Sequence, residues 1–326
     1  MNSGSRFGAA RSPGARHRLI VGAVAAMSVG MLALTACSTS SGAPPAGSGQ
    51  SAGGNVVTVV ATTNAWGSIA AQLGGTHVRE TSLITNPDTD PHDYEPTPAD
   101  ARTIAGARVV VKNGVGYDPW ADKLLAANPV SGRVVLDVGE LVHVPDGGNP
   151  HRWYSPPDVR TVVEAITADY RAADPADAAY FDAQKQTFLT HGLARYNQLI
   201  ADINATYAGT PVGASESIFA MLAPALGLNL ITPPSFLKAI SEGTDVSPAD
   251  KATIDAQIAT GAVKVYVFNS QNSTPDVAAQ VSDARQHGIP VSAVTETLTP
   301  ATASFQDWQS AQLETLQAAL HQATGR

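Results

Sequence analysis

The sequence predicts an α/β protein with two lobes, each built from βα units around a parallel sheet, joined by a long rigid helix. Short runs rich in valine, isoleucine and threonine alternate with segments of helical periodicity, a pattern typical of parallel sheets covered by helices. The alternation stops at Asp174-Pro175 and restarts after Gly209-Thr210-Pro211. We therefore expect an N-terminal lobe at 56–174, a linking helix at 175–208 and a C-terminal lobe at 209–326.

The first 36 residues have the layout of a secretory signal peptide. Four arginines and no acidic residues precede an apolar run from Leu19 to Ala36, which ends in small residues. The run is also close to the minimum length of a membrane span, so an uncleaved anchor remains the alternative.

Cys37 is the only cysteine of the chain and directly follows Leu34-Thr35-Ala36. This position resembles the lipobox of bacterial lipoproteins, in which the cysteine is acylated; a free thiol is the alternative. Residues 38–55 are mostly serine, glycine, alanine and proline, so residues 37–55 are expected to form a flexible tether. The lipid would hold the protein on the extracytoplasmic face of a bacterial cell membrane.

The charge of the chain argues against some partners. Removing residues 1–36 leaves 16 lysines and arginines against 28 aspartates and glutamates, a formal charge of −12. Such an acidic protein is a poor partner for nucleic acid or for anionic lipid. The charge permits cation binding but does not locate a site.

In the N-terminal lobe, valine-rich runs predict strands and the segments between them predict helices. Gly74-Gly75 ends the first helix, and Thr97 before Pro98 is a suitable N-cap for the second. We expect strands at 56–60, 78–84, 109–111 and 134–136, and helices at 66–73, 98–107, 120–127 and 158–172.

The linking segment is predicted to be one amphipathic helix, because no proline interrupts it from Ala176 to Tyr207. Its apolar positions are spaced by three and four residues, as on one face of a helix. These positions are Leu189, Leu193, Tyr196, Ile200, Ile203 and Tyr207. Such a helix is either ordinary core or a spine between the two lobes.

The C-terminal lobe repeats the alternation. Ser215 is a possible cap for a helix that runs to about Leu226, and Ser247 is a possible cap for the next one. We expect strands at 212–214, 263–268 and 289–294, and helices at 215–226, 248–260, 275–287 and 304–322.

Two loops carry nearly the same short phrase. One runs from Asp90 to Pro96 and presents His92; the other runs from Asn149 to Pro156 and presents His151. In each, an Asx-Pro turn precedes the histidine, and proline disfavours helix, so the imidazole is held on a stiff loop. Each histidine could also be an idle, solvent-exposed loop residue.

Two acidic residues follow strands of the second lobe. Glu216 comes after the strand that ends at Ala214, and Glu296 comes after the strand that ends at Val294. Ligands of open α/β sheets bind beyond the carboxyl ends of strands. Together with His92 and His151 they form a donor set that suits zinc, manganese or iron. Glu216 as a helix N-terminal residue and Glu296 as a surface acid are the alternatives.

These motifs resemble the zinc- and manganese-type solute-binding lipoproteins of ABC transporters. The first phrase matches the family's Asp-Pro-His-x-(Tyr/Phe)-Glu-Pro, the second its Pro-His-x-Trp, and Ser215-Glu216 its manganese-type members. The resemblance implies that His92, His151, Glu216 and Glu296 bind the ion in the cleft between the lobes. It also implies a rigid linking helix, small lobe closure, and delivery of the ion to an ABC permease and its ATPase.

The chain departs from the family's wording at several positions. Arg152 and the residues 154–156 differ from the common phrase, and Asn269 stands in a polar stretch where many relatives have an acid. Tyr94 and Asn269 are expected to support the site without binding the ion. His143 is a reserve candidate for a ligand.

The function that the sequence favours is capture of zinc or manganese, by a monomer, outside the membrane. No P-loop, HExxH pair, Gly-x-Ser-x-Gly elbow or dinucleotide fingerprint is present, so we do not expect an enzyme. A secreted metal-dependent hydrolase and a surface adhesin or interaction protein are the alternatives. Because histidine must be neutral to bind a metal, affinity should fall as the pH drops through about 6.5.

Overall fold

The computed structural model describes residues 56–326 apart from 89 and 273. The expected signal peptide, Cys37 and the tether lie outside the described residues. Within those ranges, no helix combines the length and the apolar character needed to cross a membrane.

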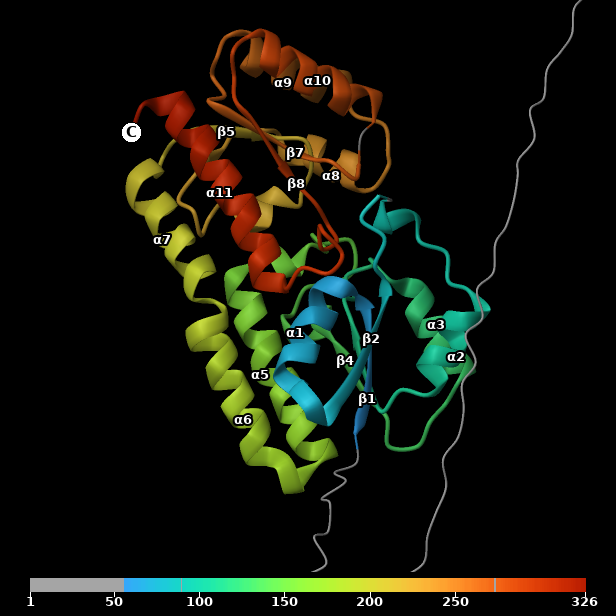
Figure 1. Cartoon of the computed structure of the whole chain (residues 1–326). Helices are drawn as coiled ribbons and strands as arrows, with labels where there is room; N and C mark the ends of the chain where they lie inside the picture. Colours follow the sequence, from blue (N-terminus) through green and yellow to red (C-terminus); the bar gives the residue numbers. More distant parts are fainter. Residues whose placement is uncertain (1–55, 89, 273) are drawn as a thin grey trace, which may run out of the picture. The chain divides into compact units, whose positions relative to one another are not determined.

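The N-terminal lobe is built around a four-stranded parallel sheet with the strand order β2-β1-β3-β4 (Figure 1). Its strands are β1 (Val57–Thr63), β2 (Val78–Ile84), β3 (Val109–Lys112) and β4 (Val134–Asp137). Its helices are α1 (Asn64–Gly74), α2 (Pro98–Ala105), α3 (Pro119–Ala127), α4 (Val138–Leu141) and α5 (Pro156–Ala173). All four residues of β3 are buried, as expected for a central strand covered on both faces.

The C-terminal lobe repeats this plan with the parallel strand order β6-β5-β7-β8. Its strands are β5 (Pro211–Ala214), β6 (Asn229–Leu230), β7 (Val265–Asn269) and β8 (Val291–Val294). Its helices are α8 (Pro234–Ser241), α9 (Pro248–Ala259), α10 (Pro275–Gln286) and α11 (Phe305–Thr324). The predicted α/β class with two parallel sheets is confirmed.

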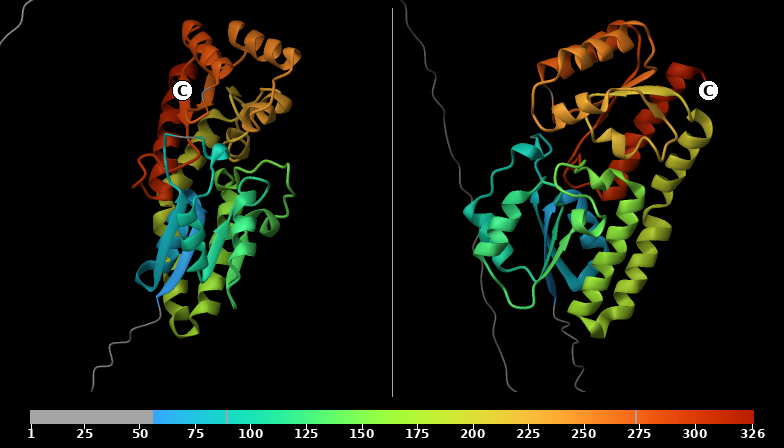
Figure 2. Two further views of the ribbon diagram at one scale, coloured as in Figure 1. Left: turned by 90° about the vertical axis from the view of Figure 1, so that its right-hand side faces the viewer. Right: turned by 180° about the vertical axis from the view of Figure 1, so that it is seen from behind.

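The linking segment is helical but is not one regular α-helix. It consists of α6 (Ala178–Thr187), a π-helical turn (Phe188–Gly192) and α7 (Ala194–Tyr207). In the turn, the Leu193 amide donates to the Phe188 carbonyl, 2.8 Å away and five residues earlier. This spacing buries Phe188 and Leu193 together, whereas the predicted stripe residue Leu189 is only partly buried. Figures 1 and 2 show α6 alongside α5 and α7 alongside α11, so the segment flanks both sheets.

The predicted helix from Ser215 to Leu226 is wrong. This segment forms turns and a short 3-10 segment (Phe219–Met221). Pro224 would interrupt the end of such a helix, because it lacks an N–H and its ring clashes with the carbonyl four residues earlier. Glu216 therefore does not start an α-helix, and the helix-dipole explanation for it no longer applies.

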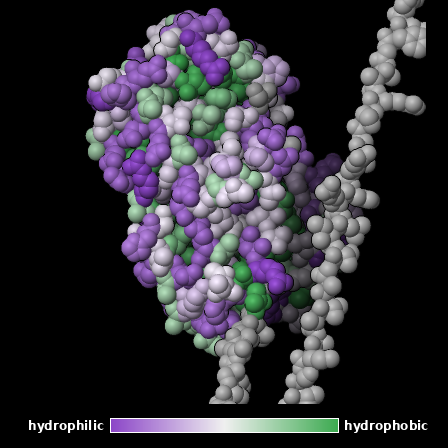
Figure 3. Space-filling view, in the orientation of Figure 1, coloured by the Kyte–Doolittle hydropathy of each residue, from purple (hydrophilic) through white to green (hydrophobic). Residues whose placement is uncertain are grey.

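The surface on the face shown in Figure 3 is predominantly hydrophilic, with hydrophobic residues in small separate groups. Val56, Val130 and Val135 are the large apolar side chains exposed among the described residues. A binding site is therefore expected at the carboxyl ends of the strands of the two sheets, where open α/β sheets bind their ligands.

Candidate metal centre

Four donor side chains from the two lobes meet in one place. His92 follows β2, His151 follows β4, Glu216 follows β5 and Glu296 follows β8. One ligand atom from each lies within 4.8 Å of the ligand atoms of the other three. The two sequence phrases and the two acidic residues therefore converge, although they are separated by up to about 200 residues of chain.

Four of the six separations between these ligand atoms are those expected around a small four-coordinate ion. His92 Nε2 lies 3.4 Å from His151 Nε2 and 3.4 Å from Glu296 Oε2. His151 Nε2 lies 3.4 Å from Glu296 Oε2 and 3.5 Å from Glu216 Oε1. An ion held about 2.1 Å from four tetrahedral donors would place them about 3.4 Å apart.

Asx turns present both histidines. The Asp90 carboxylate accepts the backbone N–H of His92 at 2.9 Å, and Asn149 Oδ1 accepts the backbone N–H of His151 at 3.1 Å. Asn149 Oδ1 also lies 3.0 Å from Nδ1 of His151, a contact that orients the ring so that Nε2 faces the other donors. The Asn113 side-chain amide donates to the Pro150 carbonyl and fixes this loop against β3.

The loop that carries Glu296 is held from both lobes. Gln271 Oε1 accepts the N–H groups of Glu296 and Thr297, at 2.5 and 3.0 Å. The Tyr154 hydroxyl of the N-terminal lobe donates to the Thr295 carbonyl at 2.7 Å. The Glu296 carboxylate thus reaches the histidines from a backbone that is tied down on both sides.

Hydrogen-bond donors surround the two carboxylates. Asn269 Nδ2 donates to Glu216 Oε2 at 2.7 Å and to Glu296 Oε1 at 2.8 Å. The Tyr117 hydroxyl donates to Glu296 Oε2 at 2.9 Å, and the Ser241 hydroxyl donates to Glu216 Oε1 at 3.1 Å. These donors orient the carboxylates toward the imidazoles.

Burial sets the ionisation of the group. His151, Glu216 and Glu296 are almost fully buried, whereas the side chain of His92 is 23% exposed. Burial, reinforced by the Glu296 charge, raises the pKa of Glu216 to about 7, and burial also raises the pKa of Glu296. Burial lowers the pKa of His151 to about 3, so this imidazole stays neutral and can donate its lone pair to a cation. Of His151 and Glu216, the carboxyl group of Glu216 is therefore the one whose pKa lies near neutral pH.

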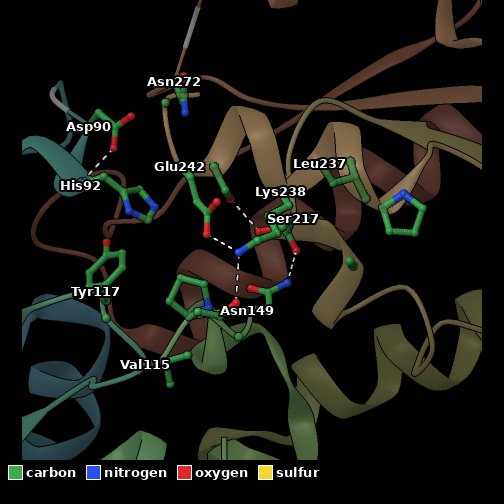
Figure 4. A pocket seen from close by; sticks show the side chains of 18 of the residues that line it. Asp90, His92, Val115, Tyr117, Asn149, Ser217, Leu237, Lys238, Glu242 and Asn272 are labelled. Atoms are coloured by element: carbon green, nitrogen blue, oxygen red, sulfur yellow. Dashed lines mark hydrogen bonds and ion pairs between the residues drawn. The ribbon is translucent and has the colours of Figure 1, made fainter. Parts of the chain in front are cut away.

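A cavity of about 690 Å³ leads from solvent to this group (Figure 4). His92 is the only one of the four donor residues that lines it. Asp90 lies beside His92 in this view, and Lys238 and Glu242 lie across from them. The ammonium group of Lys238 donates to the Gly147 carbonyl of the N-terminal lobe at 3.0 Å and pairs with the Glu242 carboxylate.

Other residues chosen from the sequence have different positions. Asn269 lies between the two carboxylates, but the Tyr94 hydroxyl donates to Asp100. His143 is exposed and does not belong to the group of four. The sequence reasoning missed Tyr117 and Ser241. Tyr117 could have been noticed because it follows a strand end, as the other site residues do, whereas no sequence signal pointed to Ser241.

A family model described as "Zinc-uptake complex component A periplasmic" matches residues 59–319. The chain belongs to this family. The resemblance found in the sequence is thereby confirmed, and the zinc-uptake component A family is one of substrate-binding transport proteins.

Curated relatives of this zinc-uptake component A chain carry metal-binding names. The manganese-binding lipoprotein MntA of Bacillus subtilis is 30% identical over 167 residues, which cover 49% of this chain and 52% of that protein. The iron-binding protein YfeA of Yersinia pestis is 29% identical over 136 residues, 40% and 43% of the two chains. The high-affinity zinc uptake protein ZnuA of Bacillus subtilis is 24% identical over 214 residues, 58% and 63%. The chain spans about half the length of the curated relatives that it matches most strongly.

Solved structures support the fold of this zinc-uptake component A chain. A crystal structure of ZnuA aligns with a TM-score of 0.66 at 21% identity and covers 82% of this chain and 100% of that one. A manganese-bound mutant of a periplasmic metal-binding protein from Candidatus Liberibacter asiaticus aligns with a TM-score of 0.68 at 19% identity, covering 81% and 99%. At these identities the likeness shows the shared two-lobe fold.

Proposed function

We propose that this protein captures a divalent transition metal, zinc or manganese, outside the cytoplasmic membrane and delivers it to an ABC importer. The observation that carries the proposal is the convergence of His92, His151, Glu216 and Glu296, whose ligand atoms lie within 4.8 Å of one another. Membership of the zinc-uptake component A family and relatives named for manganese, iron and zinc support the same cargo class. An ABC permease and its ATPase are the partners that this role requires.

The donor set supports binding rather than catalysis. A catalytic zinc site keeps a position open for water and places a general base beside it. Here four protein side chains would each supply a donor to the ion, and Tyr117, Asn269 and Ser241 already donate to the carboxylates. A carboxylate engaged in this way is a poor general base. The proposal therefore assigns no enzymatic reaction to the cleft.

The test is metal content, measured by mass spectrometry on the secreted chain without residues 1–37. The wild type, stripped of metal and then offered zinc and manganese, should retain about one equivalent. His151→Ala should lose it, because that substitution removes a buried donor. His143→Ala is the matched control, since that histidine is exposed and outside the group. Equal metal retention by the two variants, or none by the wild type, would refute the proposal.

We further propose that the protein works as a lipid-anchored monomer at the extracytoplasmic face, with residues 1–36 as the signal peptide and Cys37 acylated. Relatives named as lipoproteins and the Leu-Thr-Ala-Cys sequence support this location. Labelled palmitate should be incorporated by the wild type and lost in Cys37→Ser. A variant that still carries label in the membrane fraction would show that Cys37 is not the anchor.

A further inference from the structure

Asn269 ends β7 directly between the two carboxylates and is fully buried. Its Nδ2 group has two hydrogens, and it donates to Glu216 and to Glu296 at 2.7 and 2.8 Å. Its Oδ1 accepts the backbone N–H of Gln271 at 3.0 Å. Because the oxygen already has a donor, the amide cannot turn over without losing bonds at both ends.

Each glutamate divides its two oxygens between different neighbours. Glu216 Oε1 and Glu296 Oε2 face the histidine nitrogens at 3.4 to 3.5 Å. The opposite oxygens, Glu216 Oε2 and Glu296 Oε1, are the two that accept from Asn269. One amide therefore holds the second oxygen of both carboxylates, while Ser241 and Tyr117 donate to the oxygens that face the histidines.

This division limits how many bonds an ion can form. A carboxylate that binds through both oxygens raises the coordination number, but both oxygens must then turn toward the ion. Zinc is satisfied by four donors in a tetrahedron, whereas manganese with oxygen ligands favours six in an octahedron. Three of the four donor side chains are almost fully buried, so extra ligands can enter only from the side of His92.

We propose that Asn269 restricts each glutamate to one metal-binding oxygen, holds the site at four-coordination, and thereby favours zinc over manganese as cargo. The inference rests on the proposed metal-binding function. In this proposal Asn269 influences which ion binds but does not itself coordinate the ion.

The first test compares zinc and manganese affinities of the wild type and Asn269→Ala. Loss of the amide should weaken zinc about 10- to 100-fold, as for other residues that orient metal ligands, while manganese changes less or gains. The ratio of the two affinities should therefore fall at least about tenfold. Since zinc outcompetes manganese at almost any such site, the change in the ratio is the informative quantity. Gln280→Ala, which removes another buried amide, one bonded to the Tyr266 hydroxyl, is the matched control and should keep the wild-type ratio.

The second test reads the coordination number directly, and its wild-type measurement does not depend on whether a variant folds. The wild type loaded with Co²⁺ should show the intense visible absorption of a four-coordinate ion, and Asn269→Ala or Asn269→Ser should shift toward the weak bands of higher coordination. A weak, six-coordinate spectrum in the wild type would overturn the inference, as would an unchanged affinity ratio in the variants. Both results leave the proposed function standing. Failure of the wild type to bind any of the three ions refutes the proposed function instead.

Discussion

Glu216 and Glu296 are two buried carboxylates that share one amide donor, and their charges repel each other when no cation is bound. The pKa of Glu216, 4.5 in an ordinary environment, rises to about 7 through burial and the Glu296 charge. Between these two pH values the folded protein holds a proton that the unfolded chain has released. The stability of the metal-free protein therefore falls as the pH rises through this window, and the loss is complete above about pH 7.

Replacing Glu216 by glutamine should stabilise the metal-free protein at pH 8 by about 2–3 kcal/mol, because the amide is uncharged. Its oxygen can accept from Asn269 while its NH₂ group donates to the Ser241 hydroxyl. Thermal unfolding in the presence of a chelator should show a higher Tm for Glu216→Gln at pH 8 and little difference near pH 4.5. Glu140→Gln, which alters an exposed carboxylate, is the control. Equal Tm values at pH 8 for wild type and Glu216→Gln would contradict the expectation.

The same residues change the origin of the expected pH dependence of metal binding. The sequence predicts competition by protons at histidine, with affinity falling through about pH 6.5. In the structure the imidazole of His151 stays neutral because burial lowers its pKa to about 3. At Glu216, whose pKa is about 7, protons compete with the ion from near neutral pH, far above the pKa of His151.

The site was only partly readable from the sequence, for a physical reason. His92 and His151 lie in Asx-Pro turns, and these turns can be recognised from the neighbouring residues in the sequence. Tyr117 and Ser241 contact the carboxylates only because distant segments pack together. No local sequence pattern predicts these contacts. Tyr94 looked suitable because it is two residues from His92, yet its hydroxyl bonds to Asp100.

Among the elements, α8 makes contacts on both sides of the cavity. Its last residue, Ser241, donates to Glu216, and its Lys238 reaches the Gly147 carbonyl in the loop that leads to His151. Ser241 also bonds to Ser217, whose hydroxyl lies 3.3 Å from His151 Nδ1. The helix therefore joins donor residues of the two lobes through its own side chains.

Lys238→Ala should leave the four metal-binding side chains in place and speed metal release by about two- to fivefold. The effect is small because an exposed interaction of this kind contributes at most about 1 kcal/mol. The release rate can be followed by stopped-flow transfer of bound zinc to a coloured chelator. Lys251→Ala removes an exposed lysine whose ion pairs, with Asp255 and Asp276, lie within the C-terminal lobe. If both variants release zinc at the wild-type rate, the contact with Gly147 does not hold the lobes together.

Regular elements were predictable where residues of the element itself decide the outcome. Thr97 with Pro98 and Ser247 with Pro248 cap α2 and α9 as expected. The segment after Ser215 was predicted as a helix, and Pro224 would interrupt a helix there. The linking segment was predicted as one α-helix because no local pattern marks the π-helical turn, which buries Phe188 in place of Leu189. The short helix α8 carries a strong apolar face but lies between prolines and polar residues, and it was not anticipated.

At the scale of the whole molecule, the lobes are tied at several points around the site as well as by α6 and α7. The Asn149 amide donates to the Ser217 carbonyl at 2.6 Å, and Gln271 Nε2 donates to the Pro87 carbonyl at 3.0 Å. Tyr154 joins β8's loop and α11 to the N-terminal lobe. These bonds oppose a wide separation of the lobes, in keeping with the small closure that the family resemblance implies.

Exposure is uneven among the four donors, since only His92 borders the cavity. If the protein delivers its ion as proposed, an acceptor that approaches through the cavity would meet His92 first, while His151, Glu216 and Glu296 lie deeper. Exchange of one donor at a time would then be possible, and the ion would not have to pass through bulk water between carrier and acceptor.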